Sequence, residues 1–332
     1  MKDKINVFWF RRDLRLSDNA GLYHALIGDK QVMPVFIFDT DILDQLENRN
    51  DKRVDFIHGA VNSLNEALKK QGSTLTVFHG SVIDIFGRLT TEKNICCVYT
   101  NHDYEPYARE RDDTVCEFLK SRGVAFKSFK DQCVFEKQEV VKSDGKPYTI
   151  FTPYSRQWKN KLNPFYYKAY PTEKYFSNLL KAAPAKLPTL ESLGFEKTDL
   201  SFTPANLPAE QLLTKYKDQR DYPAIEGTSR LSVYLRFGII SVRALVARAL
   251  PLSETWLNEL IWRDFYMMIL WHFPHAATNS FKKEYDQISW VNNEKHFEKW
   301  CSGHTGFPIV DAGMRELNTT GFMHNRVRMI VS

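Results

Sequence analysis

Short apolar runs and helical segments alternate along the first half of the chain. Five runs rich in β-branched and aromatic residues predict strands, at 5–10, 31–38, 74–80, 95–100 and 124–129. Helices are predicted between them at 17–26, 53–70 and 105–122, and Ser81 is placed to cap another helix after the third run. Continuous apolar strands separated by helices are typical of a sheet that is covered on both faces. The pattern therefore predicts an α/β doubly wound parallel sheet over residues 1–130.

The pattern changes in the second half of the chain. Eight prolines punctuate residues 131–215, which predicts an irregular connector with short helices. Beyond residue 216 the strand pattern ends, and helices are predicted at about 230–237, 241–250, 254–272, 294–301, 308–319 and 322–332. Pro308 near a helix start and Gly321 just past a helix end stand where helices favour these residues. Residues 216–332 are thus predicted to form an all-α domain.

The bulk composition is that of an ordinary soluble protein with room for two domains in its 332 residues. No run of about 18 apolar residues is present, and the start MKDKINVFWFRRDLR lacks the apolar region of a signal peptide. The five cysteines form no CxxC pair and have no metal-binding spacing. We interpret them as reduced thiols of a cytoplasmic protein that has neither a metal site nor a membrane span.

The net charge of +5 is unevenly distributed. Residues 1–149 carry 22 Lys and Arg against 23 Asp and Glu, whereas residues 150–332 carry 23 against 17. A polyanionic partner for the helical half and charges scattered over a solvated surface explain this excess equally well. The sheet lacks the phosphate-binding motifs GxGxxG and GxxxxGK[ST], and the turn after its first strand reads RRDLRLSDNA. Any ligand of the sheet must be held in another way.

The segment WLNELIWRDFY places a carboxylate and a guanidinium among large aromatic residues. On a helix over 254–272, one face is apolar, and a second stripe at i, i+3, i+4 and i+7 consists of Glu259, Trp262, Arg263 and Tyr266. The simple interpretation is a solvated Glu–Arg pair worth a few tenths of a kcal/mol. Trp256 and Trp262 flank that pair, and large aromatic side chains are rarely left in water. We therefore expect the stripe to line a cavity.

Two other segments carry groups that suit an anion, although each has a simpler explanation. EGTSRLS places Thr228 and Ser229 before a helix start, where hydroxyl and free N–H groups can hold a phosphate, but an ordinary capped helix has the same pattern. GFMHNRVRM places Asn325, Arg328 and Met329 on one face of a helix and Arg326 on another. A basic surface helix would also have that pattern.

Taken together, these segments resemble the photolyase/cryptochrome family. The resemblance is carried in order by RRDLRLSDN, by YxxxRDYPAIEGTSRLSVYLRFG at 216–238, by WLNELIWRDFY and by GFPIVDAGMRELNTTGFMHNRVRM at 306–329. It is closest to the microbial class I cyclobutane pyrimidine dimer photolyases. The resemblance implies an α/β antenna-type domain followed by an all-α domain that binds FAD and DNA. It also implies light-driven DNA repair, in which reduced FAD passes an electron to a flipped pyrimidine dimer.

The resemblance assigns roles to individual residues. It implies flavin contacts for Tyr216, Thr228, Ser229, Arg230, Leu231, Ser232, Trp256, Arg263 and Arg328. It implies DNA contacts for Arg220, Glu259, Trp262, Arg263, Asn325 and Arg326, with Arg220 and Arg326 on phosphates. Glu259 would hydrogen-bond the dimer and Trp262 would stack on it, while Asn325 and Met329 would line the same pocket. Trp290 matches the outermost tryptophan of the photoreduction chain. UV-damaged DNA is the expected partner of a monomeric chain that has no obligate protein partner.

Three departures from the family pattern affect these expectations. Phe322 stands where relatives commonly have tryptophan. Tyr107-Ala108 replaces the Asn-Glu pair of the folate-binding branch, which argues against folate and leaves a deazaflavin, another flavin or no second chromophore open. The family's cofactor domain continues past the point where RVRMIVS ends this sequence. The chain is therefore expected to be a C-terminally truncated fragment, with weak FAD binding and weak or absent repair.

Four functions are weighed. The first is repair of pyrimidine dimers, and the second is a cryptochrome-type blue-light photoreceptor with the same flavin pocket. The lesion-site residues Glu259, Trp262, Asn325 and Met329 favour repair. The third is repair of the (6-4) photoproduct, which requires histidines at the positions of Asn325 and Met329. The fourth is an inert fragment in which only the α/β domain folds well.

Overall fold

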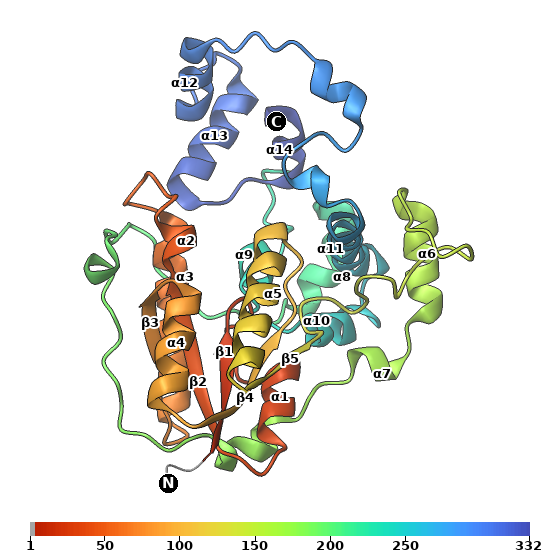
Figure 1. Cartoon of the computed structure of the whole chain (residues 1–332). Helices are drawn as coiled ribbons and strands as arrows, with labels where there is room; N and C mark the ends of the chain where they lie inside the picture. Colours follow the sequence, from red (N-terminus) through yellow and green to blue (C-terminus); the bar gives the residue numbers. More distant parts are fainter. Residues whose placement is uncertain (1–3) are drawn as a thin grey trace.

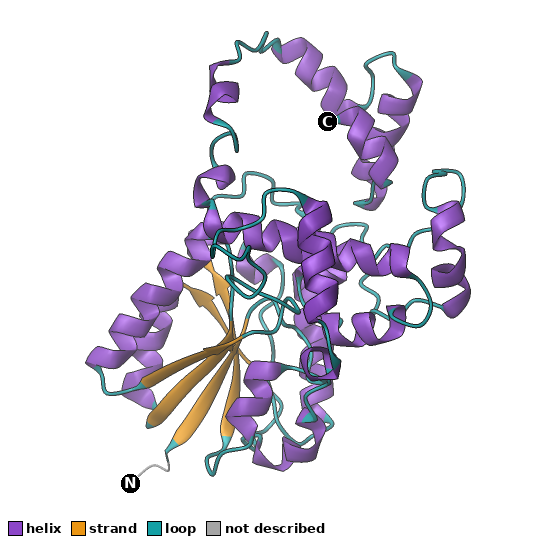
Figure 2. Ribbon diagram, turned by 90° about the vertical axis from the view of Figure 1, so that its right-hand side faces the viewer, coloured by secondary structure: helices purple, strands orange, loops and turns teal. Residues whose placement is uncertain are grey.

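A five-stranded parallel sheet occupies the first half of the computed structural model, which describes residues 4–332 (Figure 1, Figure 2). The strands are β1 (Ile5–Phe10), β2 (Val32–Asp39), β3 (Thr76–Gly80), β4 (Ile95–Asn101) and β5 (Ala125–Phe129). Their order is β3-β2-β1-β4-β5, and each neighbouring pair is parallel. The predicted doubly wound sheet is confirmed.

Both faces of the sheet are buried, which explains why its strands are continuous apolar runs. Along β1, Val7 and Trp9 pack in one apolar core with helices α4 (Val82–Glu92) and α5 (Pro106–Ser121). Phe8 and Phe10 point to the other face and pack with α1 (Ala20–Leu26) and α3 (Lys52–Lys69). Successive side chains of a strand alternate between faces, so each face needs its own apolar set.

Side chains cap the N-termini of α1 and α3 but not that of α4. Asn19 is the N-cap of α1, and its side-chain oxygen accepts a hydrogen bond from the Leu22 amide at 3.1 Å. Asp51 caps α3 in the same way through the Arg53 amide. Ser81 occupies the N-cap position of α4 as predicted, but its hydroxyl makes no capping bond. A short helix, α2 (Thr40–Leu43), follows β2.

Helices dominate the described residues after β5. The connector contains α6 (Phe151–Lys161), α7 (Pro164–Tyr167) and the 3-10 helices Thr172–Asn178 and Glu191–Leu193. The second half contains α8 (Glu210–Gln219), α9 (Ser232–Arg236), α10 (Val242–Ala249), α11 (Glu254–His272), α12 (Glu294–Ser302), α13 (Pro308–Thr320) and α14 (Asn325–Val331), with 3-10 turns at Pro274–Ala277 and Lys283–Gln287. None of the helices described within residues 4–332 has the length and apolar character that a membrane span needs.

Helix α11 lies at the centre of the apolar core of the helical half, which we call the helical core. The apolar face expected from its periodicity is buried, namely Leu257, Leu260, Ile261, Phe265 and Met268. Tyr154 and Trp158 of the connector helix α6 pack in the same core. The connector also returns to the sheet. Leu179 is buried in the sheet core that contains Phe8 and Phe10, and the Leu180 amide donates to the Val32 carbonyl at 2.8 Å. The connector therefore contributes side chains both to the helical core and to one core of the sheet.

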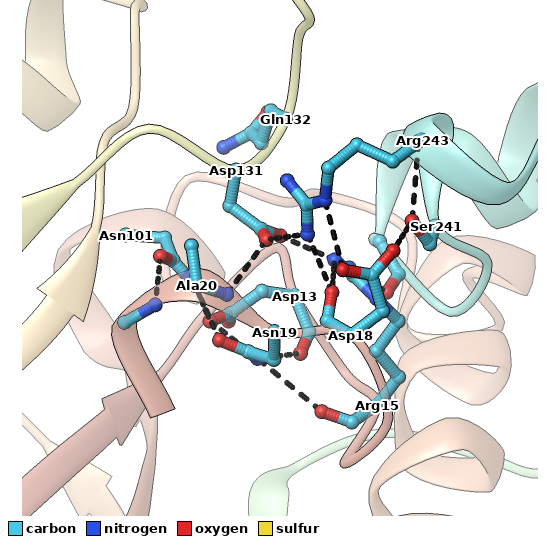
Figure 3. Close-up of polar contacts among 12 residues, drawn as sticks. Asp13, Arg15, Asp18, Asn19, Ala20, Asn101, Asp131, Gln132, Ser241 and Arg243 are labelled. Carbon is cyan, nitrogen blue, oxygen red and sulfur yellow. Dashed lines mark hydrogen bonds and ion pairs between the residues drawn. The ribbon is translucent and has the colours of Figure 1, made fainter. Parts of the chain in front are cut away.

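Four buried charged side chains join the sheet to the helical half (Figure 3), and we call them the junction network: Arg15, Asp18, Asp131 and Arg243. One carboxylate oxygen of Asp131 lies 2.7 Å from Arg15 Nη2, and the other lies 2.8 Å from Arg243 Nη2. Arg243 Nε donates to Asp18 at 2.8 Å. Burial alone would raise the pKa of Asp131, but the two guanidiniums hold it at about 2.

A second buried carboxylate, Asp264 of α11, ties the connector to the helical core. Its Oδ2 accepts hydrogen bonds from the Val134 amide at 3.1 Å, the Phe135 amide at 3.2 Å and Trp158 Nε1 at 3.0 Å. Its Oδ1 is buried without a hydrogen-bond partner. Burial raises the pKa of Asp264 to about 6, against the opposing effect of these donors and of Arg263.

This carboxylate predicts a measurable pH dependence of stability. Because the folded pKa of about 6 lies above the ordinary 3.8, the folded state binds the proton more tightly than the unfolded chain. The free energy of unfolding should therefore fall by roughly 2–3 kcal/mol as pH rises from about 4 to about 6, and this loss should level off above that. Urea unfolding at closely spaced pH values measures it. In Asp264→Asn this component should be absent, and an unchanged pH profile would show that Asp264 does not titrate in this range.

Helices α12, α13 and α14 form a small group of their own at the top of Figure 1, around the buried residues Met314, Met323 and Val327. Lys52 at the start of α3 donates to the carbonyls of Asn318 and Thr319, which belong to the last turn of α13. A cation at this end of a helix stabilises the orphan carbonyls. The α/β half thus contacts the group that carries the C-terminal motif.

Candidate functional site

Helices α8, α11 and α14 meet around a cavity of about 520 Å³, which we call the central cavity. Its lining consists of Tyr216, Arg220, Asp221, Thr228, Glu259, Trp262, Tyr266, Asn325, Arg326 and Met329. The stripe predicted on α11 therefore does line a cavity through three of its four members. Side chains from three separate sequence motifs converge here, which a solvated helix surface would not require.

Glu259 lies half-buried in this cavity and is paired. Its Oε1 is 2.5 Å from Arg220 Nη1 at the end of α8. Burial raises the pKa of Glu259 above its ordinary value, although the nearby Arg220 opposes the shift. Burial and then Glu259 together raise the pKa of Tyr216, on the same wall, to about 12. The site thus contains a half-buried carboxyl group that is paired with one guanidinium.

Trp262 belongs to an aromatic stack. Phe151 of α6 covers it with ring centroids 3.6 Å apart and planes within 4°, and Tyr266 stacks with centroids 5.5 Å apart. Trp262 and Tyr266 both line the central cavity. The stack fixes the orientation of the indole and forms a flat apolar wall, one turn along α11 from the Glu259 carboxyl group.

Charged side chains of alternating sign cross the rim of the cavity. Arg326 of α14 donates through Nε to Asp221 Oδ1 at 2.8 Å, and its Nη2 lies 2.7 Å from the same oxygen. Arg220 Nε lies 3.5 Å from that oxygen, while its Nη1 contacts Glu259. We call Arg326, Asp221, Arg220 and Glu259 the rim chain. Both arginines expected on phosphates are therefore paired with carboxylates of the protein.

The expected phosphate loop is divided between two cavities. Thr228 lines the central cavity, whereas Ser232 lines a neighbouring cavity of about 330 Å³. Gly227 is required by close packing, because a Cβ there would lie 2.7 Å from Gln219 Cβ. Arg230 is exposed, has the left-handed φ of +50°, and places its guanidinium 4.7 Å from the ring of Phe322. Ser229 is half-buried and Leu231 is buried.

Arg263 does not face the central cavity. It turns toward the junction of the two halves, where its guanidinium donates to the Gln132 carbonyl of the connector and, at 3.3 Å, to the Leu235 carbonyl of α9. Burial lowers its pKa. Arg263 lines the neighbouring 330 Å³ cavity together with Ser232 and Tyr266. The i+4 position lies beside Glu259 along the helix, but the Arg263 side chain donates to the Gln132 and Leu235 carbonyls instead.

The remaining predicted residues are dispersed. Trp256 is buried in the helical core, and Trp290 is 71% exposed in the segment before α12. The expected faces of α14 are wrong in one respect: Arg326 lines the central cavity with Asn325 and Met329, whereas Arg328 does not. Asn325 is the first residue of α14, so both it and the long Arg326 side chain reach the rim of the cavity.

Sequence reasoning missed Asp221 and Asp264. The only signal for Asp221 is its position directly after Arg220. That position does not distinguish a carboxylate that pairs with arginines at a cavity rim from one that is surrounded by water. Asp264 follows Arg263 on α11, and in the sequence the two resemble neighbouring charges on an exposed helix surface. The structure leaves Asp264 only 1% exposed. Among the described residues, no cluster of His, Cys, Asp and Glu could hold a metal ion.

A third cavity lies at the carboxyl ends of the strands, between the two halves of the chain. It has a volume of about 410 Å³, and its lining includes Trp9, Asp39, Tyr107 and Arg111. The Tyr107 hydroxyl donates to Asp39 at 2.7 Å, and Arg111 lies 4.9 Å from the Trp9 ring. Open α/β sheets bind ligands at this edge, where the strand order reverses.

Comparison with known proteins places these features in a family. Residues 6–174 match the family described as DNA photolyase, and residues 256–332 match the FAD binding domain of DNA photolyase. The chain is 35% identical to a deoxyribodipyrimidine photo-lyase from Synechococcus sp., covering 98% of this chain and 72% of the relative. It is 31% identical to the protein of that name from Escherichia coli, covering 98% and 73%.

Solved structures give the same result. A class III photolyase from Agrobacterium tumefaciens superimposes with a TM-score of 0.85 at 30% identity, covering 100% of this chain and 72% of that one. An archaeal photolyase from Sulfolobus tokodaii, described with two FAD molecules, gives 0.80 at 32% identity, covering 99% and 74%. A Synechocystis cryptochrome gives 0.82 at 25% identity, covering 100% and 74%. By sequence, fold and domain order, the chain belongs to the photolyase/cryptochrome family.

Proposed function

We propose that this chain binds DNA containing a cyclobutane pyrimidine dimer and, with reduced FAD, reverses the dimer in light. One observation carries the proposal: Glu259, Trp262, Asn325 and Met329 line a single cavity. A pyrimidine dimer that has left the DNA stack has flat apolar faces and polar edges. It therefore requires an aromatic wall together with a hydrogen-bonding acid and amide.

The residues around the two adjoining cavities fit an FAD. Thr228 and Ser232 offer hydroxyl groups to a diphosphate, Tyr266 is shared by both cavities, and Arg263 brings a guanidinium to the second. Gly227 permits a backbone turn that a larger residue would block. When bound and reduced, FAD would supply the electron that splits the dimer.

The protein's own contribution is orientation and electrostatics. Trp262 would hold the dimer by stacking, with Phe151 keeping the indole in place at 3.6 Å. In its protonated form Glu259 would donate a hydrogen bond to the dimer oxygen on which negative charge develops, and burial, which raises the pKa of Glu259, favours that form. Arg220 would then leave Glu259 and contact a DNA phosphate.

The likeness to a cryptochrome favours blue-light signalling as a second candidate. A photoreceptor would need the flavin pocket but not a lesion site. Repair of the (6-4) photoproduct is not favoured, because Asn325 and Met329 offer no titratable imidazole for proton transfer. The location of Glu259, Trp262, Asn325 and Met329 around one cavity supports dimer repair over both.

Purified protein tests the proposal directly. The absorption spectrum reports flavin, and an oligonucleotide with one thymine dimer reports repair under blue light after chemical reduction of the flavin. Light-dependent loss of the dimer, absent in the dark, is the expected result. Bound flavin that is photoreduced without dimer reversal would instead support signalling. The same duplex with a (6-4) photoproduct should remain unrepaired.

The cavity at the strand ends is our proposed site for a second chromophore. Its walls combine the apolar side chains of β2 with Trp9, Tyr107 and Arg111, which suits a flat aromatic ring with a polar edge. Such a ligand would be a flavin or deazaflavin rather than a folate, because Tyr107-Ala108 stands where the folate-binding branch has its Asn-Glu pair.

This assignment gives a testable expectation for the purified protein. Tyr107→Ala removes an aromatic ring of the cavity lining and its hydrogen bond to Asp39, and should lower the content of any second chromophore by roughly tenfold. The FAD content should remain, because Tyr107 lies outside both adjoining cavities of the helical half. Chromatography of the extracted chromophores measures both. Loss of FAD together with the second ligand would contradict separate sites.

A further inference from the structure

Asp221 occupies the position between the two arginines that the proposed function assigns to DNA phosphates. A single oxygen, Oδ1, lies 2.7 Å from Arg326 Nη2 and 3.5 Å from Arg220 Nε. Arg326 Nε donates to the same oxygen at 2.8 Å. One anionic oxygen contacting two guanidiniums is also how a bridging phosphate oxygen binds a pair of arginines. Asp221 is exposed at the rim rather than part of the apolar packing.

The charges along the rim chain balance in this arrangement. Arg220 and Arg326 contribute two positive charges, and Asp221 and Glu259 contribute two negative ones when ionised. A phosphate that approaches the rim therefore meets guanidiniums that already contact carboxylates. To bind, it must displace a carboxylate that is covalently tethered and hence present at high effective concentration.

We propose that Asp221 is an internal surrogate for a DNA phosphate, which competes with DNA for Arg220 and Arg326 and so weakens binding to undamaged duplex. This inference rests on the proposed function, because it requires DNA to bind at the central cavity. Phosphate contacts carry no sequence or lesion information of their own. A tethered competitor for these contacts lowers the affinity that is common to all DNA, and leaves recognition of the lesion to the cavity.

The position of the Asp221 carboxylate between the two arginines has a second effect. Without a bound anion, two guanidiniums this close would repel each other, and long side chains at a surface would spread over several rotamers. Asp221 holds both on one oxygen at the cavity rim. The arginines are thereby kept at a separation that one phosphate can bridge, so DNA exchanges one anion for another and the site needs little rearrangement.

Asp221→Asn tests the proposal, because it removes the charge and keeps the shape. Affinity is measured by fluorescence anisotropy with an undamaged duplex and with the same duplex carrying one thymine dimer, over a series of salt concentrations. We expect the variant to bind both duplexes about 3- to 10-fold more tightly at low salt. The slope of log affinity against log salt should be steeper by about 1, because a further phosphate contact is gained.

Two comparisons separate this effect from a change in overall charge. Asp218→Asn makes the same charge change one turn earlier, on α8, at an exposed residue that does not line the central cavity. It should leave affinity within twofold. In an Arg326→Ala background, Asp221→Asn should have a much smaller effect, since one of the two guanidiniums it competes for is gone.

Each outcome decides the question. Weaker binding by Asp221→Asn, or affinity unchanged within twofold, overturns the surrogate role, and Asp221→Ala provides a second variant should the first be poorly folded. An equal gain for Asp218→Asn would assign the effect to net charge and also overturn it. If the unaltered protein binds dimer-containing and undamaged duplex alike, the proposed function fails instead, and the comparison of Asp221→Asn with the unaltered protein on undamaged duplex still stands.

Discussion

Replacing Glu259 by alanine is expected to lower the yield of light-driven dimer reversal by at least about tenfold while the flavin content stays nearly intact. The carboxyl group lines the central cavity together with Trp262, which lies one turn further along α11. Its removal would leave charge on the dimer without a hydrogen-bond donor, and loss of one such group in a site shielded from water commonly costs tenfold or more. Quantum yield with a defined thymine-dimer substrate measures repair, and the flavin absorbance of the same sample measures cofactor content.

Two further variants test whether the loss of repair comes from the carboxyl group itself. Glu259→Gln retains a donor and should keep much more of the repair yield than alanine, although it loses the ion pair with Arg220 at 2.5 Å. Asn258→Ala changes the neighbouring residue of α11, which is not part of the cavity lining, and serves as a control for damage to the helix. If flavin disappears from Glu259→Ala, the carboxyl group acts in the fold or in cofactor binding, and its role toward the dimer is wrong.

Replacing Asp131 by alanine is expected to destabilise the protein by about 3–5 kcal/mol. The carboxylate is fully buried and is shared by Arg15 and Arg243 at 2.7 and 2.8 Å. Breaking a buried pair leaves uncompensated charge away from water. Here Arg15 would lose its carboxylate partner, and Arg243 would keep only Asp18. The midpoint and slope of urea unfolding measure the loss.

A surface ion pair provides the matched control. Glu66 and Lys69 lie on the exposed side of α3 with 2.7 Å between their charged atoms, and Glu66→Gln should cost well under 1 kcal/mol. Asp131 also makes the protein acid-sensitive. Its folded pKa of about 2 lies below the ordinary 3.8, so its stabilising contribution is present above about pH 4 and is lost as pH falls toward 2. A cost below 1 kcal/mol for Asp131→Ala would mean that water replaces the lost carboxylate.

Much of the fold could be predicted because it follows from periodicity. The strand β1 reads as one apolar run since alternate residues enter two different cores, and the buried face of α11 repeats at helical spacing. The connector was the harder region. Its prolines indicate irregular backbone, but nothing in the local sequence shows that Trp158 packs under α11 or that Leu179 returns to the sheet.

The candidate site was predictable in part, for a related reason. Glu259, Trp262 and Tyr266 face one cavity because a rigid helix fixes their directions. Arg263 does not, because its long flexible side chain can turn away from its helical position, and it donates to the Gln132 and Leu235 carbonyls. Asp221 lies in a loop, where sequence neighbours carry no directional information. The roles assigned to the individual residues remain predictions.

The junction network has a consequence for how the protein can be divided. Cutting the chain near residue 130, where the sequence pattern changes, would separate Arg15 and Asp18 from Asp131 and Arg243. Each piece would expose charged side chains whose partners lie on the other piece. Neither piece should therefore fold stably by itself. The two halves should instead melt in one cooperative transition. They should also keep a fixed mutual orientation, which is what transfer of excitation energy between two bound pigments would require.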